Sequence, residues 1–390
     1  MTALAVEALD ELADGTKAGA FPLIRGDLHL TYDQIGLLIS APLLIGGLLE
    51  LPFGLVAGSG SRRHRLVLAG GVLLAGSLAA VASASGFWFL LAALIAFFPA
   101  SGAFVGLTQA ALMDADPGRQ QERMAAWNLA GSAGAVAGPS LVAVVLSAGG
   151  TWRAAYVLVA GAAVVTVAVT AVAGPASLAG GTAKAEANTA SQEDMESERP
   201  SLKAALKAIR RGDVARWLIL LQVIDLLLDV FTGYLGVYLV DVARVSPALA
   251  AVGVAISLGA GLAGDALFVL VSGRVSGQAA LRASACVAAI CYPAFLLVPA
   301  LGVKFVLLGL LNIATACWYP VIQAGLYGSL PGQSGIAVFW SSAAGIAGSA
   351  GPFLVGVLAQ QAGLGPAMWC LTLAPAAVLM LGKIKRSIDD

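Results

Sequence analysis

The sequence predicts an all-α integral membrane protein whose twelve transmembrane helices form two pseudo-symmetric six-helix bundles. Three observations predict this fold class: the composition, the spacing of apolar segments and an internal repeat. Of the 390 residues, 59% are hydrophobic and only 11% are charged, whereas soluble domains carry about 25% charged residues. The formal net charge is zero, so the chain offers nucleic acid no basic field. The composition therefore excludes a soluble enzyme, a nucleic-acid binder and a disordered chain.

The apolar segments are long enough to cross a bilayer. A hydrocarbon core of about 30 Å requires about 20 apolar residues in a helix. Segments of this kind, in chain order, cover residues 3–24, 34–57, 66–85, 87–113, 124–148, 153–173, 216–240, 247–272, 280–300, 303–328, 335–360 and 364–383. An even number of crossings returns the chain to the side on which it starts.

One long polar stretch divides these segments into two sets of six. Residues 174–215 are rich in Ala, Ser, Thr, Glu and Lys, a composition typical of a flexible linker. Within them, residues 200–212 combine basic and apolar side chains in the pattern of an amphipathic helix on a membrane surface. We therefore expect an N-terminal bundle in residues 1–173, a cytoplasmic linker in 174–215 and a C-terminal bundle in 216–390.

Lysine and arginine residues predict the orientation, because they concentrate in cytoplasmic loops. Most of them lie in the linker, in the C-terminal tail, or in and beside the loops that follow even-numbered segments. Lys17 lies inside the first segment. The opposite side receives only Arg25, Arg153, Arg244 and Lys304. Both termini are therefore expected in the cytoplasm.

The second set of segments repeats the first at an offset of about 215 residues, as in transporters built from parallel repeats. Three acidic pairs align: Asp10 with Asp225, Asp14 with Asp229, and Glu50 with Asp265. Further pairs follow at slightly smaller offsets: Gln109 with Gln323, Trp127 with Trp340, and Gly138-Pro139 with Gly351-Pro352. Acid-on-acid matches are hard to obtain by chance in so apolar a chain. The repeat therefore predicts two equivalent bundles around a pseudo-two-fold axis.

Carboxylic acids lie inside the apolar segments, where each charge costs about 2.5–3.5 kcal/mol at mid-membrane. They are Glu7, Asp10, Glu11, Asp14, Glu50, Asp225, Asp229 and Asp265. On a helical projection, the four acids of the first segment fall within an arc of about 100°. Only Lys17 opposes this charge, so we expect the acids to face a water-filled cavity. Equivalent positions in the repeat predict that each bundle contributes half of the acidic site.

The acids of the first segment also allow a structural interpretation. Lys17 is spaced to pair with Asp14 or Asp10 along one helix. Such a pair would still leave the other acids uncompensated. Glu7 lies nearest the cytoplasm and belongs either to the site or to the membrane interface.

The remaining acids have structural alternatives of their own. The leucine run between Asp225 and Asp229 predicts a continuous helix rather than a helix end. Glu50 and Asp265 stand beside proline or glycine, where a carboxylate can satisfy the backbone of a kink. Intramembrane carboxylates are nevertheless functional by default.

Other side chains are candidates for the cavity wall. They are Lys17, Gln109, Gln323, Trp318 and Tyr319. The two aromatic residues would offer ring faces to a cation, although packing explains them equally well. The two glutamines would hydrogen-bond either a substrate or a neighbouring helix.

Several motifs resemble those of the major facilitator superfamily. Asp14-Gly15, Pro22-Leu23-Ile24 and the stretch 32–38 are similar to the first segment and second-segment entry of its bacterial drug-type exporters. The signature loop between segments two and three is matched by Gly54, Arg62 and Arg63. Gly58 lies in the same loop but stands where the family has an acid. The fifth-segment motif of proton-linked antiporters is matched by Gly134, Gly138 and Pro139, which the repeat partly duplicates in Gly351 and Pro352. The glycines also predict close helix contacts.

The resemblance implies the major facilitator fold, alternating access and a place in a cell membrane of bacterial type. With the acidic cavity, it leads us to expect a secondary active transporter that exports a small cation in exchange for protons. Both histidines, His29 and His64, are expected in loops, so the acids would carry the protons. We expect no enzymatic activity and no cofactor, since no nucleophile–histidine pair or phosphate loop occurs in the segments. The fold would support a monomer.

The sequence is compatible with more than one kind of cation. An organic cation requires apolar and aromatic walls beside one or two acids. A divalent metal requires several oxygen ligands, which Asp10, Asp14, Asp225 and Asp229 would supply. A lipid or lysolipid transporter and a non-transporting membrane sensor are further alternatives.

Overall fold

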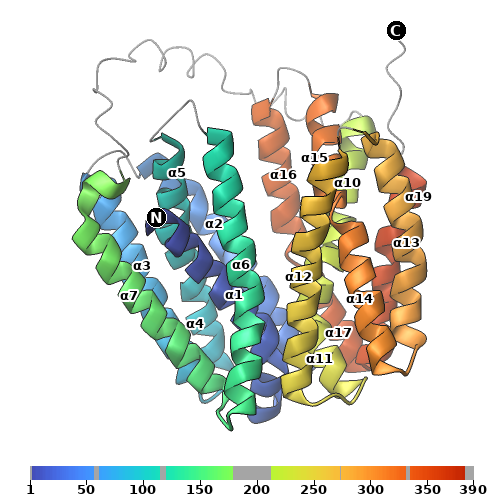
Figure 1. The fold of residues 1–390 in the computed structure, drawn as a ribbon, viewed down its shortest axis with the longest axis horizontal. Helices are drawn as coiled ribbons and strands as arrows, with labels where there is room; N and C mark the ends of the chain where they lie inside the picture. Colours follow the sequence, from blue (N-terminus) through green and yellow to red (C-terminus); the bar gives the residue numbers. More distant parts are fainter. Residues whose placement is uncertain are drawn as a thin grey trace. The chain divides into compact units, whose positions relative to one another are not determined.

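The computed structural model describes residues 2–56, 61–114, 120–178, 212–272, 274–330 and 334–382. Within these ranges the chain is helical and contains no strand (Figure 1). Most of the predicted linker, with the surface helix expected from residue 200 onward, lies outside the described residues.

The first six predicted segments correspond to helices with similar bounds. They are α1 (Thr2–Asp27), α2 (Tyr32–Val56), α3 (Ser61–Ala82), α4 (Phe87–Ser101) continued by the π-helical turn η1 (Gly102–Gly106) and α5 (Leu107–Asp114), α6 (Gln120–Ser147) and α7 (Trp152–Leu178). Gly174 interrupts the helical backbone of α7 with a φ of 69°, a conformation that glycine adopts without steric cost.

The second six segments are also helical and contain more interruptions. They are α10 (Gly212–Asp225) continued by the π-helical turn η2 (Leu226–Val230) and α11 (Phe231–Asp241), α12 (Pro247–Val271), α13 (Gly277–Leu297), α14 (Leu301–Thr315) with α15 (Trp318–Ser329), α16 (Ser334–Gly348) with α17 (Gly351–Ala362), and α18 (Leu364–Met368) with the 3₁₀ turn η3 (Trp369–Thr372) and α19 (Leu373–Leu381).

The length and hydropathy of these helices fit a membrane protein. Ten helical stretches in the described ranges are long and apolar enough to span a bilayer. The helix α2 adds a shorter apolar stretch, Tyr32–Gly46, and α1 is 26 residues long but carries the acidic side chains and Lys17. Large apolar side chains of α7 are exposed, Val172 to 89%, as expected for a helix that faces lipid.

Two helix interruptions occupy equivalent places in the internal repeat. The offset of 214 residues that aligns Gln109 with Gln323 also aligns Gly102, the first residue of η1, with Ala316. Ala316 lies in the short break between α14 and α15. The predicted continuous helix through Asp225 and Asp229 is confirmed, but η2 inserts a π-helical turn that the sequence did not predict. A run of leucines favours helix but does not distinguish an α-turn from a π-turn.

Packing divides the chain into two compact units. The first contains the described parts of Met1–Ala183, Thr232–Gly259 and Ser349–Met368. The second contains those of Lys184–Phe231, Ala260–Gly348 and Trp369–Asp390. The units follow spatial contact, and the division into residues 1–173 and 216–390 stays a prediction.

In the first unit, glycines bring α1 and α6 into backbone contact. A Cβ atom at Gly134 would overlap the carbonyl of Ala8, and one at Gly138 would overlap the backbone of Thr16. On the facing helix, a Cβ atom at Gly15 would meet the backbone of Ala135. Small residues allow such close approach of membrane helices, so the predicted role of these α6 glycines is confirmed.

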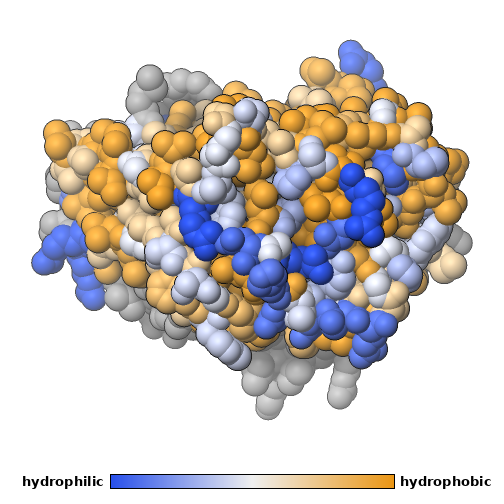
Figure 2. Space-filling model, turned by 90° about the horizontal axis from the view of Figure 1, so that it is seen from below, coloured by the Kyte–Doolittle hydropathy of each residue, from blue (hydrophilic) through white to orange (hydrophobic). Residues whose placement is uncertain are grey.

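At one end of the first unit, helices from both halves of the sequence contact one another. The Tyr234 hydroxyl of α11 donates to the Pro352 carbonyl of α17 at 2.9 Å, beside Gly36 of α2. Asp241 accepts from Arg25 at 2.7 Å and from the Tyr32 hydroxyl at 2.9 Å. Figure 2 looks onto the end where the α1–α2 and α11–α12 loops lie, and hydrophilic residues gather there among hydrophobic ones.

In the second unit, α10 packs against α15, α16 and α19, and α13 packs against α14. The Trp217 ring of α10 fills the space beside Gly325, where a Cβ atom would approach it to 2.7 Å. Phe231 contacts the rings of Tyr292 and Phe295 edge to face. These contacts fix the helix that carries Asp225.

Candidate functional site

The four acids of α1 do not all meet the same neighbours. The Glu7 carboxylate lies beside the Trp127 indole of α6. A Cβ atom at Gly131 of α6 would lie 2.6 Å from Glu7 Oε1 and 3.3 Å from Glu11 Cγ. Glu7 and Glu11 therefore lie against α6. A helical projection gives the face of a residue but not the helix that it meets.

Asp10 is directed toward α4 instead. The Ser101 side chain lies beside its carboxylate, and the charges of Asp14, Glu11 and Lys17 act on it. Its Oδ1 atom is buried and has no hydrogen-bond partner among the described residues. A buried oxygen without a partner costs free energy.

Lys17 forms the ion pair that the sequence offered as one alternative. Its Nζ atom lies 2.5 Å from Asp14 Oδ1 and 5.6 Å from the centroid of the Phe98 ring on α4. The Lys17 side chain is 19% exposed and the Asp14 side chain is 45% exposed. The first unit thus contains a carboxylate and an aromatic ring that already hold an ammonium group.

The second acidic pair lies in the second unit, at the π-helical turn. Asp225 ends α10 and Asp229 lies inside η2. The charges of both act on Tyr319 of α15, whose side chain is 54% exposed. Tyr319 is therefore placed beside the acids, as expected of a wall residue. Turns of π-helix occur frequently at functional sites.

Trp318 does not line a cavity as the sequence allowed. It is fully buried, and its indole donates to the Ser284 hydroxyl of α13 at 2.8 Å. The equally weighted packing interpretation is the correct one. Neighbouring residues on a helix point in different directions, so Tyr319 is exposed where Trp318 is enclosed.

The two glutamines have different surroundings. Gln109 Nε2 lies 3.7 Å from the Met124 sulfur of α6. In the second unit, the Oε1 atom of Gln323 is buried without a hydrogen-bond partner among the described residues, and so is that of Gln222. Gln222 was missed in the sequence, although a polar residue three positions before Asp225 was the available signal. It packs against Gly348.

The third acidic pair in the repeat is Glu50 and Asp265, and the structure describes the side chain of Asp265 alone. The side chain of Glu50 lies outside the part of the chain whose side chains are described. Asp265 is exposed on α12, while Gly264 beside it packs on Ile313 and Ala316. The structure therefore places Asp265 at a helix surface and not in a helix contact.

Neither unit, within the described residues, holds three or more His, Cys, Asp or Glu side chains grouped as metal ligands. The predicted histidine positions are partly wrong: His29 follows α1, but His64 lies in the first turns of α3 and is buried. Arg62 and Arg63 precede it on the same helix, and Arg62 is exposed.

The motif residues that are described lie at helix contacts. Pro139 of α6 packs beside Gly15 and Gly19 of α1. Gly351 begins α17, and the Pro352 carbonyl accepts the Tyr234 hydrogen bond. Gly54 lies in the last turns of α2, and Gly58 falls outside the described residues.

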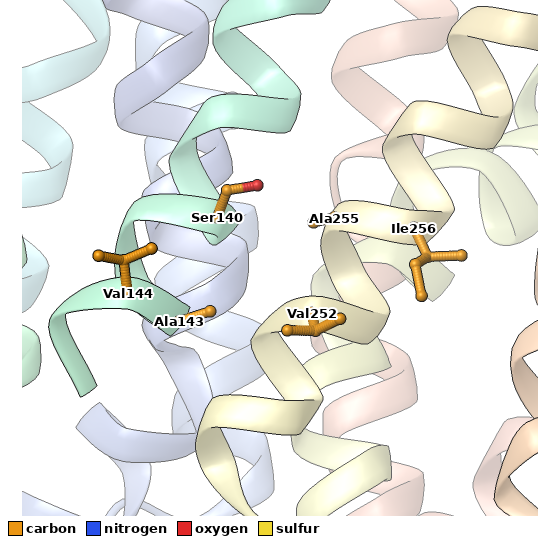
Figure 3. Close-up of a pocket in the computed structure, with 6 residues that line it drawn as sticks. All are labelled: Ser140, Ala143, Val144, Val252, Ala255 and Ile256. Atoms are coloured by element: carbon orange, nitrogen blue, oxygen red, sulfur yellow. The ribbon is translucent and has the colours of Figure 1, made fainter. Parts of the chain in front are cut away.

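A separate pocket of about 370 Å³ lies between α6 and α12 in the first unit. Figure 3 shows Ser140, Ala143 and Val144 on one side and Val252, Ala255 and Ile256 on the other. The Ser140 hydroxyl donates to the Val136 carbonyl of its own helix. The pocket is therefore apolar and offers no charged group to a cation.

Comparisons with known proteins agree with this architecture. A family model described as Major Facilitator Superfamily matches residues 8–337. A bacterial homologue of the human lysosomal transporter Spinster has 14% identity and a TM-score of 0.75, covering 97% of this chain and 95% of that one. The nucleoside transporter NupG has 14% identity and a TM-score of 0.73, covering 98% and 99%.

The peptide transporter POT in complex with sulfate is also similar, with 13% identity, a TM-score of 0.69, and coverage of 98% and 93%. A comparison with curated proteins gives no match. At these identities the solved structures show a shared fold, and the predicted all-helical fold class is confirmed.

Proposed function

The chain belongs to the major facilitator superfamily and is a secondary transporter rather than an enzyme, and we propose that it exports a small organic cation in exchange for protons. The cation would pass through an acidic cavity by alternating access. We place the protein, as a monomer, in a cell membrane of bacterial type with both termini in the cytoplasm.

Asp10 is the observation that carries this proposal. A carboxylate with a buried, unpartnered oxygen at mid-helix is costly unless it binds a proton or a cation. If a cation displaces the proton on one side of the membrane and the proton returns on the other, the two movements are coupled. Antiport then requires no group other than the acids.

An organic cation fits the described residues better than a divalent metal. The acids of each unit lie beside aromatic rings, Phe98 in the first and Tyr319 in the second. Rings and a few carboxylates suit an organic cation, whereas a metal requires several oxygens at short range. The similar structures carry substrates as different as nucleosides and peptides, so the fold alone does not select one.

A lipid is the second candidate substrate, and the pocket between α6 and α12 favours it. Its apolar lining would accept an acyl chain but not a cation. Replacement of Ala255 by Trp would fill this pocket. A lipid transporter would lose activity in this variant, whereas a cation transporter would retain it.

Sealed vesicles containing the purified protein and a trapped pH dye test the main proposal. Tetramethylammonium, labelled 1,4-diaminobutane and a series of divalent metals are added separately. We expect the organic cations to enter and the lumen to become more alkaline in the wild type. Protein-free vesicles and vesicles with Asp10→Asn correct for passive amine movement.

A matched control is Asp213→Asn, because Asp213 lies in the first turn of α10, outside the acidic pairs. This variant should transport as the wild type does. Proton movement with metals alone would replace the organic cation by a metal. If no cation changed the lumen pH, the proposal would be contradicted.

A further inference from the structure

Lys17 occupies a position that a substrate cation would also fit. Its ammonium group donates to a carboxylate, Asp14, at 2.5 Å and lies over an aromatic ring, Phe98, at 5.6 Å. Both contacts are recognised ways of binding an ammonium group: a charge-assisted hydrogen bond and the face of a ring.

From this geometry we propose that Asp14 and Phe98 form a binding site for a primary ammonium group, which Lys17 fills as an intramolecular competitor in the unloaded protein. The inference rests on the proposed function and names its substrate class. A substrate bearing a primary amine would displace Lys17 and take over its contacts. Lys17 is then a specificity-determining residue in addition to an ion-pair partner.

The ring is held in place by residues other than Lys17. Phe98 packs against α2, where a Cβ atom at Gly46 would lie 2.7 Å from Phe98 Cβ. Its neighbour Phe97 contacts it edge to face, with centroids 6.1 Å apart. The ring therefore stays available when Lys17 moves away, as a substrate site requires.

The carboxylate is also accessible to a ligand. Asp14 is 45% exposed, more than twice the 19% of Lys17. A cation can thus approach the free side of Asp14 before the lysine leaves. A purely structural ion pair has no need of an open carboxylate.

The displaced lysine has a second anion within reach of its charge. Asp10 lies on the same helix, seven positions before Lys17, and is subject to the charge of Lys17. Its Oδ1 atom has no hydrogen-bond partner among the described residues. Transfer of Lys17 from Asp14 to Asp10 would keep the lysine charge compensated and would favour release of a proton from Asp10.

The chemistry of the pair selects a primary ammonium group. Such a group donates N–H bonds to a carboxylate, whereas a quaternary ammonium has no N–H and an alcohol has no charge. The end of a lysine side chain is chemically n-butylammonium. This ion is therefore the probe that best imitates the present occupant.

Lys304 provides a matched comparison in the second unit. Its Nζ atom also lies over a ring, at 4.9 Å from the Phe295 centroid, but it donates to the Phe295 carbonyl at 2.5 Å. This contact satisfies a backbone oxygen near the end of α13. Lys304 therefore combines a ring with a backbone carbonyl, whereas Lys17 combines a ring with a carboxylate.

Calorimetric titration of the purified full-length protein with n-butylammonium at neutral pH tests the proposal. If the lysine fills the site in about nine molecules of ten, its removal should tighten binding about tenfold. We expect this gain in Lys17→Met and Lys17→Gln and no change in Lys304→Met. Asp14→Asn should abolish detectable binding, and Phe98→Leu should weaken it roughly threefold to tenfold.

Tetramethylammonium and 1-butanol should each bind at least about tenfold more weakly than n-butylammonium. Unchanged or weaker n-butylammonium binding in both Lys17 variants would overturn the proposal, as would loss of fold in both, because Lys17 would then be structural. Equal binding of 1-butanol would overturn it as well. If n-butylammonium binds as expected but no cation moves protons in vesicles, the proposed function fails and the binding site stands.

Discussion

The acidic pair of α1 and the acidic pair at η2 are equivalent in sequence but differ in structure. Asp10 and Asp14 lie on an uninterrupted α-helix, and Lys17 neutralises Asp14. Asp225 and Asp229 flank a π-helical turn, and the residue equivalent to Lys17 is Thr232. The repeat thus preserves the acids and changes both the backbone and the counter-ion.

This difference suggests different roles for the two acidic pairs. A rigid helix with an internal ammonium group is suited to recognising a cation. A π-helical turn is held by fewer regular hydrogen bonds and can revert to α-helix, which re-aims the side chains that follow it. We therefore expect the first pair to govern affinity and the second to govern the conformational step.

The largest effect is expected at Asp10. Asp10→Asn removes the group that would exchange a proton for the cation, so proton-coupled uptake in vesicles should fall about a hundredfold or more. Binding of n-butylammonium to Asp14 should persist, because Asp14 and Phe98 are unchanged. Wild-type uptake in Asp10→Asn would remove Asp10 from the mechanism and would leave no difference in role between the two acidic pairs.

Deletion of Leu228 tests the π-helical turn. Removing one residue from η2 should restore regular α-helix and change the direction of the Asp229 side chain relative to Asp225. Transport should fall by about tenfold or more, while n-butylammonium binding at Asp14 and Phe98 should be unaffected. Both quantities are measured on the same folded preparation. Unchanged transport would show that the π-turn has no part in the cycle.

The rigidity of the helix that carries Asp10 and Asp14 depends on the α1–α6 contact. Gly134→Ala introduces a Cβ atom that overlaps the Ala8 carbonyl, and overpacking of this kind costs about 1–3 kcal/mol. The expected result is a lower temperature of thermal unfolding. The matched control is Gly161→Ala on α7, where a Cβ atom meets nothing within 4 Å. Equal stability of the two variants would show that α1 and α6 can move apart at little cost.

The smallest expected effect comes from adding a lysine at the position equivalent to Lys17. Thr232→Lys places a lysine three residues after Asp229, the spacing of Lys17 and Asp14. An exposed ion pair at this spacing contributes about 0.3–0.5 kcal/mol, so apparent affinity for the transported cation should fall roughly twofold. Thr232→Gln controls for side-chain size. A loss as large as that of Asp10→Asn would mean that the second pair, and not the first, binds the cation.

Much of the fold follows from the sequence because membrane spans require long apolar helices. The predicted segments agree with the helices to within a few residues, and the glycines of α6 lie where close contact was expected. The π-helical turn at η2 was missed, because apolar composition does not report the number of residues per turn. His64 was misplaced, since a basic sequence around it resembled a loop.

The candidate site was predictable as a list of residues but not as a set of neighbours. Charge in an apolar segment identified Glu7 and Asp10 together, yet Glu7 meets Trp127 of α6 and Asp10 meets Ser101 of α4. Which helix lies beside a given face depends on tertiary packing. Phe98 was missed for the same reason, because nothing in its local sequence separates it from Phe97.

The most direct test of the central claim is accumulation of labelled 1,4-diaminobutane against its concentration gradient. Vesicles with an acidic lumen contain the wild type, Asp10→Asn or no protein. If protons leaving the lumen drive the cation inward, wild-type vesicles should accumulate it above the level of the other two. Equal accumulation in wild-type, Asp10→Asn and protein-free vesicles would contradict exchange of an organic cation for protons.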